Sequence, residues 1–410
     1  MVGDRAWLGK LLAELCTLIA PVFAQARSRL VAFAYVAALL TVAGDRKSCW
    51  QLGEQAGHAT PRRMQALLAE YAWDWRVVLA RLQLFILAHL ADPGAILVLD
   101  ETAELKKGKM TAGVARQHAG ITGQIENCQT VVFLAYVTAR AHTLFSFRLY
   151  LPKQWCENTA RRGRAQVPGD VAFAAKTEQG TEMVTEAVAA RVPFGWVAGD
   201  EVYGRSSKLR AACEDAGKGY VFAVPVNFKV TTPAGRKAAV AGLARLVPAA
   251  AWETRSCGRG CKGHRDYEWA LIAARSPRHW LLIRRKISDR ADLAFFYTHA
   301  PGSVSLPILI KVAGKRWPVE ECFLPSNPRG RPALTSTSCA SGGRFTGTPC
   351  CPCVPSRCSP SPPPGHPAAP RPGPLPIQAP APVPLTSRNT GATPASSLPA
   401  PARNLPRTSG

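Results

Sequence analysis

One boundary limits how much of this chain can fold. Glu320 and Glu321 are the last acidic residues of the 410, and no Asp, Glu or Lys follows Phe323. Residues 324–410 hold 22 of the 35 prolines and a single aromatic side chain. A segment of that composition buries too little apolar surface to offset the conformational entropy lost on folding. We therefore predict that 324–410 is a disordered, Pro-rich tail and that 1–323 is the folded part.

The folded part is strongly basic. The formal charge of the chain is +24, and the eight arginines of the tail leave +16 for residues 1–323. Such a surplus favours a polyanionic partner, because each cation near a phosphate releases counterions. An anionic membrane is the alternative, but no apolar run approaches the roughly 18 residues of a spanning helix. Thirteen scattered cysteines without a disulfide framework suit a reducing compartment. We expect a cytoplasmic protein that binds nucleic acid and does not enter a membrane.

Residues 1–90 have the apolar spacing of helices. The stretches "LGKLLAELCTLIAPVF" and "RSRLVAFAYVAALLTV" each keep one apolar face. Between residues 48 and 73 we expect two short helices around a turn, with Thr60 as N-cap and Pro61 at the first helical position. Arg62 and Arg63 then begin the second helix. This pattern fits a helix-turn-helix reader of DNA, and it also fits an ordinary helical bundle with two solvated arginines.

From residue 95 the pattern changes to that of a mixed α/β domain. "AILVLD" (95–100) and "FGWVAGDEVYG" (194–204) are apolar runs that end in acids, as expected of buried central strands. Residues 129–152 predict a hairpin with its turn near Ala139–Ala141. The remaining predicted elements are a helix at 181–193, a helix and a strand at 206–226, further strands at 226–305, and a helix from Pro307.

Three acidic doublets stand out: Asp100-Glu101, Asp200-Glu201 and Glu320-Glu321. The first two end apolar strands, and the carboxyl ends of strands are where sites form in open α/β sheets. Carboxylates brought together repel unless a cation lies between them. Mg²⁺ is the usual partner, because it takes hard oxygen ligands and keeps waters for a phosphate substrate.

Two other interpretations of the doublets stay open. Acids at strand ends often cap the next helix or are solvated. A pair of carboxylates can also serve as the acid and base of a glycosidase. The basic charge and modest aromatic content weigh against a carbohydrate cleft.

Several stretches resemble one family. They are "VLDETAELKKGKMTAGVARQHAGITGQIENCQTVVFLAYVTARAHTLFSFRLYLPKQW", "WVAGDEVYG", "GDRKSCWQLGEQAG", "WLLIRRKISDRADLAFFYTHAP" and "VAGKRWPVEECF". They are similar to the catalytic core of bacterial insertion-sequence transposases of the DDE type, the DDE-5-like endonucleases. The resemblance runs from about residue 20 to Phe323.

The resemblance implies an RNase H-like fold with a catalytic triad of Asp100, Asp200 and Glu320, which holds two Mg²⁺ ions, with Mn²⁺ as the alternative. Glu320 is preferred to Glu321 because relatives place an Arg four residues before the catalytic Glu, where this chain has Arg316. At that spacing Arg316 can steady the carboxylate or a phosphate.

Other residues are candidates for contact with DNA. Tyr203 either helps to position DNA or packs on the sheet. Lys106, Lys107 and Lys109 either contact phosphates or lie in a solvated loop.

The resemblance ends at Phe323, where the family continues with a Lys and a long amphipathic helix. Residues 331–343 can be back-translated into GC-rich codons whose neighbouring frame contains acids and Trp and resembles that continuation. We infer a frameshift just after Phe323. A genuine Pro-rich segment that binds an SH3-like groove is the alternative.

The sequence therefore predicts a DNA transposase of a bacterial insertion sequence that is truncated or frameshifted after Phe323. We expect it to act on element ends and target DNA, and to form a homodimer in the DNA complex. The alternatives are a non-catalytic DNA-binding remnant and a metal-dependent nuclease without joining activity. The predicted parts are a helical DNA-binding domain (1–90), the first part of the core (91–225), a strand-rich insertion (226–305), the catalytic-Glu helix (306–323) and the tail (324–410).

Overall fold

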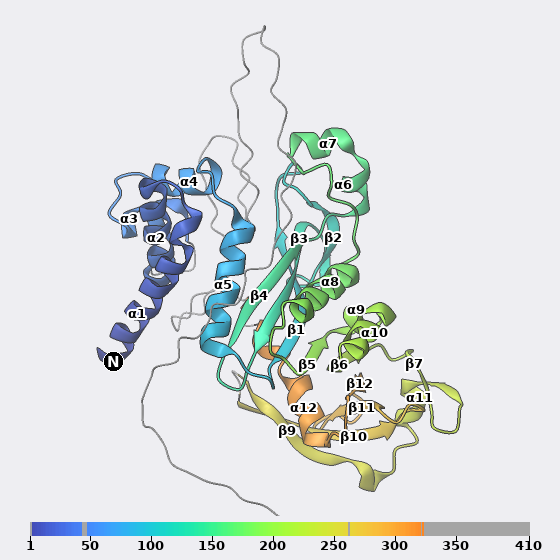
Figure 1. Ribbon diagram of the computed structural model, residues 1–410. Coiled ribbons are helices and arrows are strands. Elements are labelled where there is room, and N and C mark those ends of the chain that lie inside the picture. Colours follow the sequence, from blue (N-terminus) through green and yellow to red (C-terminus); the bar gives the residue numbers. More distant parts are fainter. Residues whose placement is uncertain (1, 43–46, 261–262, 321, 324–410) are drawn as a thin grey trace, which may run out of the picture. The chain divides into compact units, whose positions relative to one another are not determined.

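The computed structural model describes residues 2–42, 47–260, 263–320 and 322–323 (Figure 1). The predicted disorder of 324–410 falls outside the described residues. Six helical segments come first in the chain: α1 (Val2–Ile19), the 3-10 helix η1 (Ala20–Val22), α2 (Ala26–Thr41), α3 (Cys49–Gln55), α4 (Arg62–Ala69) and α5 (Trp75–Leu90). The described part of the chain has no helix whose length and apolar character would suffice to cross a membrane.

The first helices share a small core of their own. Ile19, Phe23, Tyr35, Leu52 and Met64 are buried together there. The short helix α3 is fixed by a capping box, in which Ser48 and Gln51 each accept from the other's backbone N–H.

Helix α4 begins at Arg62, one residue later than predicted. Its N-cap is Pro61, with φ −72° and ψ −5°, and no side chain caps it. Pro61 is already helical in φ, and its carbonyl accepts from the Gln65 N–H at 3.0 Å, but it has no N–H of its own to donate. The predicted pair of short helices, α3 and α4, is otherwise confirmed.

The strands follow from residue 96. They are β1 (Ile96–Leu105), β2 (Ala115–Ala119), β3 (Gln124–Val137), β4 (His142–Leu149), β5 (Trp196–Gly199), β6 (Gly219–Val224), β7 (Lys229–Thr231), β8 (Lys237–Ala239), β9 (Glu253–Gly260), β10 (Gly263–Ala273), β11 (His279–Lys286) and β12 (Leu293–His299). The predicted hairpin is confirmed as β3 and β4. Its turn is held by Thr138 Oγ1, which accepts from the N–H groups of Arg140 and Ala141.

Ten of these strands form one mixed sheet. Its order is β2-β3-β1-β5-β6-β12-β11-β10-β9, with β4 also paired to β3. Strand β3 is antiparallel to β1 and to β4, whereas β5 is parallel to β1 and β6 is parallel to β5. The strands predicted at 226–305 largely continue this sheet, because β12 pairs with β6. Strands β7 and β8 form a separate two-stranded sheet.

Helices pack against both faces of the sheet. After β4 come α6 (Lys153–Glu157), α7 (Thr159–Arg164) and α8 (Lys176–Ala189); α9 (Glu201–Gly204) and α10 (Ser207–Asp215) connect β5 to β6; α11 (Val240–Ala244) and the 3-10 helix η2 (Ala249–Ala251) precede β9; α12 (Leu306–Gly314) and α13 (Trp317–Glu320) come last. The residues of β1 alternate between the faces. Leu97 and Leu99 pack with α8 and α10, and Ile96 and Val98 pack with α12. A strand buried on both faces explains the unbroken apolar run in the sequence.

The predicted mixed α/β fold is confirmed, with two local differences. The helix expected at 181–193 begins at Lys176, where the Glu178 carboxylate accepts from Ala175 N–H at 3.0 Å. The helix expected over 306–323 is interrupted: α12 ends at Gly314 and α13 begins at Trp317. A Cβ at Gly314 would lie 2.2 Å from the Cys257 carbonyl oxygen, so α12 approaches β9 closely at its last residue.

Gly204 closes α9, the short helix that follows Asp200, against strand β6. A Cβ there would lie 1.9 Å from the carbonyl oxygen of Ala223, which is backbone and cannot turn aside. We predict that Gly204→Ala lowers the free energy of unfolding by about 2 kcal/mol or more. The matched control is Gly242→Ala in α11, where a Cβ meets no heavy atom within 4 Å. Urea unfolding of both variants measures the difference, and equal stabilities would contradict the close packing of α9.

Candidate active site

Two aspartates meet at the carboxyl edge of the parallel strands. The register pairs Leu99 of β1 with Gly199 of β5, so Asp100 and Asp200 are the next residues on neighbouring strands. Adjacent strands lie about 4.8 Å apart, which brings these two positions together. The predicted meeting of two strand-end acids thus has its backbone basis in this pairing.

Asp100 is buried, with 8% of its surface exposed. Its Oδ1 accepts from the N–H of Glu101 at 2.9 Å, and its Oδ2 lies 3.9 Å from Nη1 of Arg316. Arg316 lies in the turn between α12 and α13. Arg316, which the resemblance predicts to act beside the catalytic carboxylates, therefore lies next to Asp100.

Asp200 is the N-cap of α9. Its Oδ1 accepts from the N–H groups of Val202 at 2.9 Å and Tyr203 at 3.4 Å. The interpretation that a strand-end acid caps the next helix therefore holds for Asp200. The cap also fixes the orientation of this carboxylate directly after the strand end, so the capping role and a role in a site are compatible.

Glu101 takes no part in the pairing of Asp100 with Arg316. Its Oε1 lies 2.6 Å from Nζ of Lys176, the first residue of α8, and both side chains are about four-fifths buried. Its Oε2 is buried and has no hydrogen-bond partner in the part of the chain that the structure describes. The first doublet therefore separates into an aspartate beside Arg316 and a glutamate held by Lys176.

Tyr203 packs against the sheet and is fully buried. Burial raises the pKa of its phenol well above the ordinary value, and the carboxylates of Glu101, Asp200 and Asp100 raise it further. The phenol is therefore neutral, and its buried hydroxyl has no hydrogen-bond partner among the described residues. Two orphaned polar atoms, this hydroxyl and Oε2 of Glu101, thus accompany the two aspartates.

Glu320 is the last residue of α13, and its side chain lies outside the described part, as does Glu321. The neighbouring residues are placed: Val319 is buried in the core beneath the sheet, and the Phe323 ring lies 5.3 Å from that of Phe133 on β3. Among the described residues, no three His, Cys, Asp or Glu side chains form a group that could hold a metal. The predicted third ligand therefore stays a prediction.

Apart from Arg316, the predicted DNA-contacting residues lie in two places, α4 and the loop after β1. Arg62 is largely exposed and pairs with Glu70, and Arg63 beside it is exposed. Lys106 pairs with Glu104 at 3.0 Å and is mostly buried, whereas Lys107 and Lys109 are exposed.

The loop that carries Lys107 and Lys109 is held by its backbone. Asn127 donates to the carbonyls of Lys106 and Gly108, and Arg161 donates to the carbonyl of Lys109 at 2.7 Å. The Arg161 guanidinium also lies 3.7 Å from the ring centre of Trp155. These contacts fix the loop and leave the two lysine side chains exposed.

Lys176 is the site residue that sequence reasoning missed. A lysine at a helix start gives no sign of a partner 75 positions away. The charge pairing depends on α8 lying over the end of β1, which no local pattern predicts.

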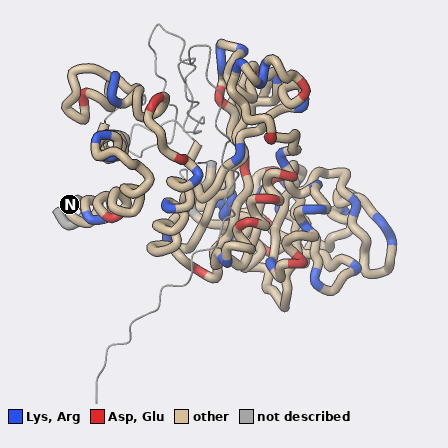
Figure 2. The backbone as a smooth tube through the Cα atoms, turned by 45° about the horizontal axis from the view of Figure 1, so that its top comes forward, with Lys and Arg blue, Asp and Glu red and all other residues tan. Residues whose placement is uncertain are grey.

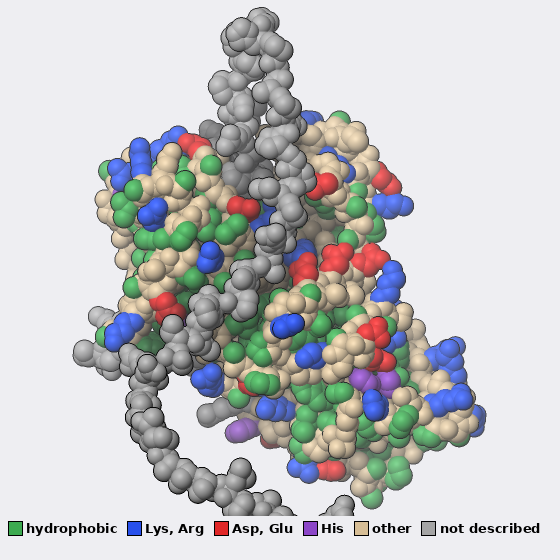
Figure 3. Space-filling model, in the orientation of Figure 1, with side chains coloured by type: hydrophobic (Ala, Val, Ile, Leu, Met, Phe, Trp, Pro, Cys, Tyr) green, Lys and Arg blue, Asp and Glu red, His purple; other side chains and the backbone are tan. Residues whose placement is uncertain are grey.

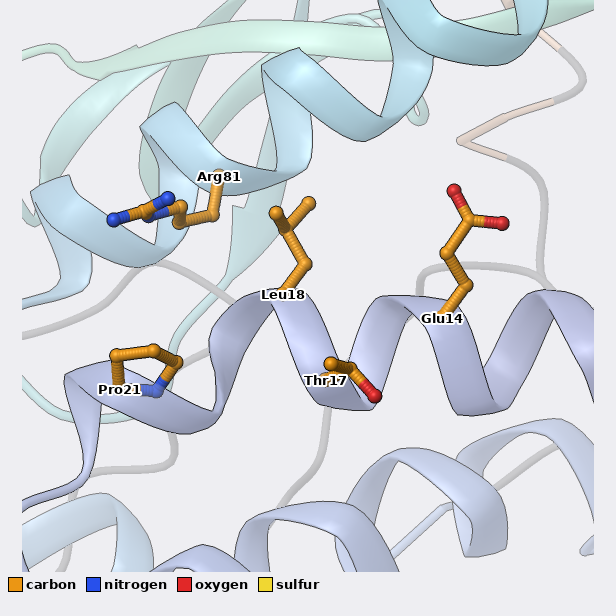
Figure 4. Close-up of a pocket in the computed structure, with 5 residues that line it drawn as sticks. All are labelled: Glu14, Thr17, Leu18, Pro21 and Arg81. Carbon is orange, nitrogen blue, oxygen red and sulfur yellow. The ribbon is translucent and has the colours of Figure 1, made fainter. Parts of the chain in front are cut away.

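A shallow pocket of about 380 Å³ lies between the first helix and α5 (Figure 4). Glu14, Thr17, Leu18, Pro21 and Arg81 line it. In Figure 4 the side chain of Leu18 lies between those of Glu14 and Arg81. It contains none of the predicted site residues, and nothing in its lining suggests chemistry.

A comparison with protein families identifies the class of this protein. The model of the DDE superfamily endonucleases matches residues 19–265, which is more than half of the chain and includes Asp100 and Asp200. The chain belongs to the DDE superfamily endonucleases. It is therefore a nuclease-type enzyme with DNA as its substrate class, from a family that generally uses divalent metal ions.

The other comparisons add no argument. No curated protein matches the chain. Among solved structures, the NurA nuclease from Sulfolobus solfataricus has 8% identity and a TM-score of 0.25, over 59% of this chain and 77% of that one.

We predict that Lys176→Met lowers the free energy of unfolding by about 2 kcal/mol, because it leaves the largely buried Glu101 carboxylate without its cation. The double variant Lys176→Met/Glu101→Gln should regain most of that loss. Lys208→Met is the matched control, since its pair with Glu178 is exposed and contributes at most about 1 kcal/mol. Urea unfolding that shows equal losses for Lys176→Met and Lys208→Met would contradict the structural role of Lys176.

Proposed function

We propose that this chain is a DNA transposase of a bacterial insertion sequence, which cleaves and joins DNA strands with Asp100, Asp200 and Glu320 as its catalytic carboxylates. The observation that carries the proposal is the parallel register of β1 with β5, which makes the two aspartates neighbours at one edge of the sheet. Family membership supports DNA cleavage at this edge.

The topology supports an RNase H-like core. Five strands run in the order β4-β3-β1-β5-β6, with β3 alone antiparallel to its neighbours β1 and β4. Strands β5 and β6 follow β1 in a parallel arrangement. This is the expected arrangement of an RNase H-like sheet, with Asp100 on its first strand and Asp200 at the end of its fourth. Strands β9–β12 are then the insertion that precedes the Glu helix.

The residues present fit a divalent cation. Asp100 and Asp200 are the next residues after paired positions of β1 and β5, and they offer the hard oxygen donors that Mg²⁺ or Mn²⁺ prefers. Asp100, Asp200 and Glu320 would hold two ions. A bound cation pair supplies activation of water and charge neutralisation at the scissile phosphate.

The chain's own residues have separate tasks. Asp200 is held in place by the N-terminus of α9, and Glu101 is kept out of the aspartate pair by Lys176. Arg316, 3.9 Å from Asp100, is placed to bind a phosphate oxygen beside that carboxylate. Arg62, Arg63, Lys107 and Lys109 offer charge to the backbone of element-end or target DNA. Lys106 reaches a phosphate only by leaving Glu104.

We predict that Asp100→Asn and Asp200→Asn each lower Mg²⁺-dependent strand cleavage by at least about 100-fold, since each removes a metal-binding charge. DNA binding should change little. Glu201→Gln, an exposed acid next to Asp200, is the control and should cleave at the parental rate. Glu320→Gln should be impaired and Glu321→Gln should not. Parental cleavage by both aspartate variants would overturn the assignment.

Cleavage and joining assays separate this proposal from its alternatives. Nicking without transfer to a second duplex would favour a nuclease without joining activity. Binding without nicking would favour a non-catalytic remnant. A homodimer in the DNA complex and a bacterial cytoplasmic location are parts of the transposase proposal.

Binding should depend steeply on salt, because phosphate contacts dominate it. We predict that the triple variant Arg63→Gln/Lys107→Gln/Lys109→Gln weakens duplex binding and lowers the slope of log affinity against log salt by about 1 for each phosphate that is no longer neutralised. The measurement is an anisotropy titration at several salt concentrations without metal. Affinity that does not change with salt in the parental chain would remove the charge argument.

We infer further that a frameshift after Phe323 separates this copy from its relatives. Support comes from the change in composition at 324 and from the neighbouring frame, which restores acids and Trp. We predict that restoring the frame after codon 323 raises strand joining from undetectable to measurable, since the Glu320 helix would then continue. The nucleotide sequence across that codon is the first check. Robust transposition by the protein as given would show that the segment is a genuine part of it.

A further inference from the structure

A pocket of about 530 Å³ lies outside the aspartate pair, between α10, β7 and the β10–β11 connection. Arg210, Lys229 and Arg275 contribute three cations to its lining, and Thr231 and Ser276 contribute hydroxyls. Phe228 and Tyr297 add two aromatic rings, and Val230 and Ala274 complete the lining.

Contacts among the lining residues give the pocket a defined shape. The Arg275 N–H donates to the Thr231 carbonyl at 2.8 Å, which ties the β10–β11 connection to β7. The Phe228 and Tyr297 rings lie 5.5 Å apart, and the Arg210 guanidinium lies 5.5 and 5.6 Å from their centres. The cation of Arg210 is thus oriented before any ligand arrives.

The lining of the pocket carries positive charge only. No acidic residue lines it, and among the described residues none of the three cations forms an ion pair with a carboxylate. Lys229 and Arg275 are exposed. Figures 2 and 3 show further Lys and Arg residues gathered at the right-hand margin, where β7 and α11 lie. Three cations around one hollow repel each other, and an anion between them removes that repulsion.

The chemistry of the lining selects a phosphate group. Guanidinium and ammonium groups with neighbouring hydroxyls match the several acceptor oxygens of a phosphate, and the two rings offer a surface for a sugar or base. A nucleic acid presents such groups in series, whereas free phosphate or a nucleotide presents them once.

The pocket is connected to the aspartate pair. Arg210 donates through Nη1 to the Gly204 carbonyl, and the Gly204 N–H donates to the Asp200 carbonyl at 2.9 Å. Two hydrogen bonds thus join the cation of the pocket to the residue that holds a candidate catalytic carboxylate. A phosphate bound there would be held in a fixed relation to Asp200.

We propose that this pocket binds a backbone phosphate of the DNA substrate away from the scissile bond. The proposal deepens the proposed function and rests on DNA as the substrate, but it does not depend on which residues cleave.

The test uses the full chain and a labelled duplex without divalent metal. The variant is Lys229→Gln/Arg275→Gln, and the control is Arg236→Gln/Lys237→Gln, which removes the same charge from exposed residues beside the pocket. We expect the pocket variant to bind about tenfold more weakly at low salt and to lower the salt slope by about 2, and the control to change affinity less than about twofold. Equal losses in both variants, or no loss in either, would overturn the proposal.

A second measurement leaves the protein unaltered. A lysine-acetylating reagent should modify Lys229 more slowly when duplex is bound, while Lys237 should react at a nearly constant rate. Equal protection of the two lysines would contradict the pocket. Titration with inorganic phosphate and with a nucleotide tests whether the pocket binds a free phosphate compound instead of DNA. Tight binding of either compound, together with unchanged duplex affinity in the pocket variant, would assign the pocket to that compound.

The binding test of the pocket and the cleavage test of the aspartates can fail independently of each other. If the aspartate variants cleave normally but the pocket variant loses binding, the phosphate-binding role of the pocket is supported and the catalytic role of the aspartates is contradicted. If the aspartate variants fail to cleave as expected, while the pocket variant and its control both bind DNA like the parent, the catalytic role of the aspartates is supported and the phosphate-binding role of the pocket is contradicted.

Discussion

The parallel pairing of β1 with β5 determines where every other part of the site lies. Its register is set by burial, because Ile96 and Val98 pack on one face and Leu97 and Leu99 on the other. A slip of one residue would exchange the faces of all four side chains. Fully burying one such side chain contributes about 1.5–3 kcal/mol, so the core enforces the register strongly. The position of Asp100 beside Asp200 is a consequence of this apolar packing.

The two-residue period of a strand also explains why the first doublet does not act as a unit. Successive side chains point to opposite faces, so Asp100 lies on the side of Arg316 and Glu101 on the side of α8. Glu101 is then largely buried, and Lys176 supplies the charge that its burial requires. In the second doublet, Asp200 caps α9 while Glu201 is exposed on the first turn. Adjacent acids therefore have different physical roles at both strand ends.

Local patterns predicted the elements that depend on local contacts. The strand at 95–100, the hairpin around Thr138 and the acids at strand ends all follow from apolar runs and turn residues close in sequence. The pairing of Glu101 with Lys176 and the addition of β12 to β6 could not be predicted, since both join segments about 75 positions apart. The third carboxylate rests on the family resemblance, because Glu320 is distinguished from Glu321 by the relatives' Arg-to-Glu spacing, which Arg316 and Glu320 match.

The interruption between α12 and α13 changes how Arg316 acts. An unbroken helix would place Arg316 and Glu320 on one face, four residues apart. The chain instead turns at Lys315 and Arg316, where Lys315 Nζ donates to the Thr138 carbonyl at 3.3 Å and Arg316 reaches Asp100. At 3.9 Å the two groups lie at the outer limit of an ion pair, and more than a quarter of the Arg316 side chain is exposed. The same turn that brings a guanidinium to the buried aspartate therefore also presents this guanidinium to a phosphate oxygen of the substrate.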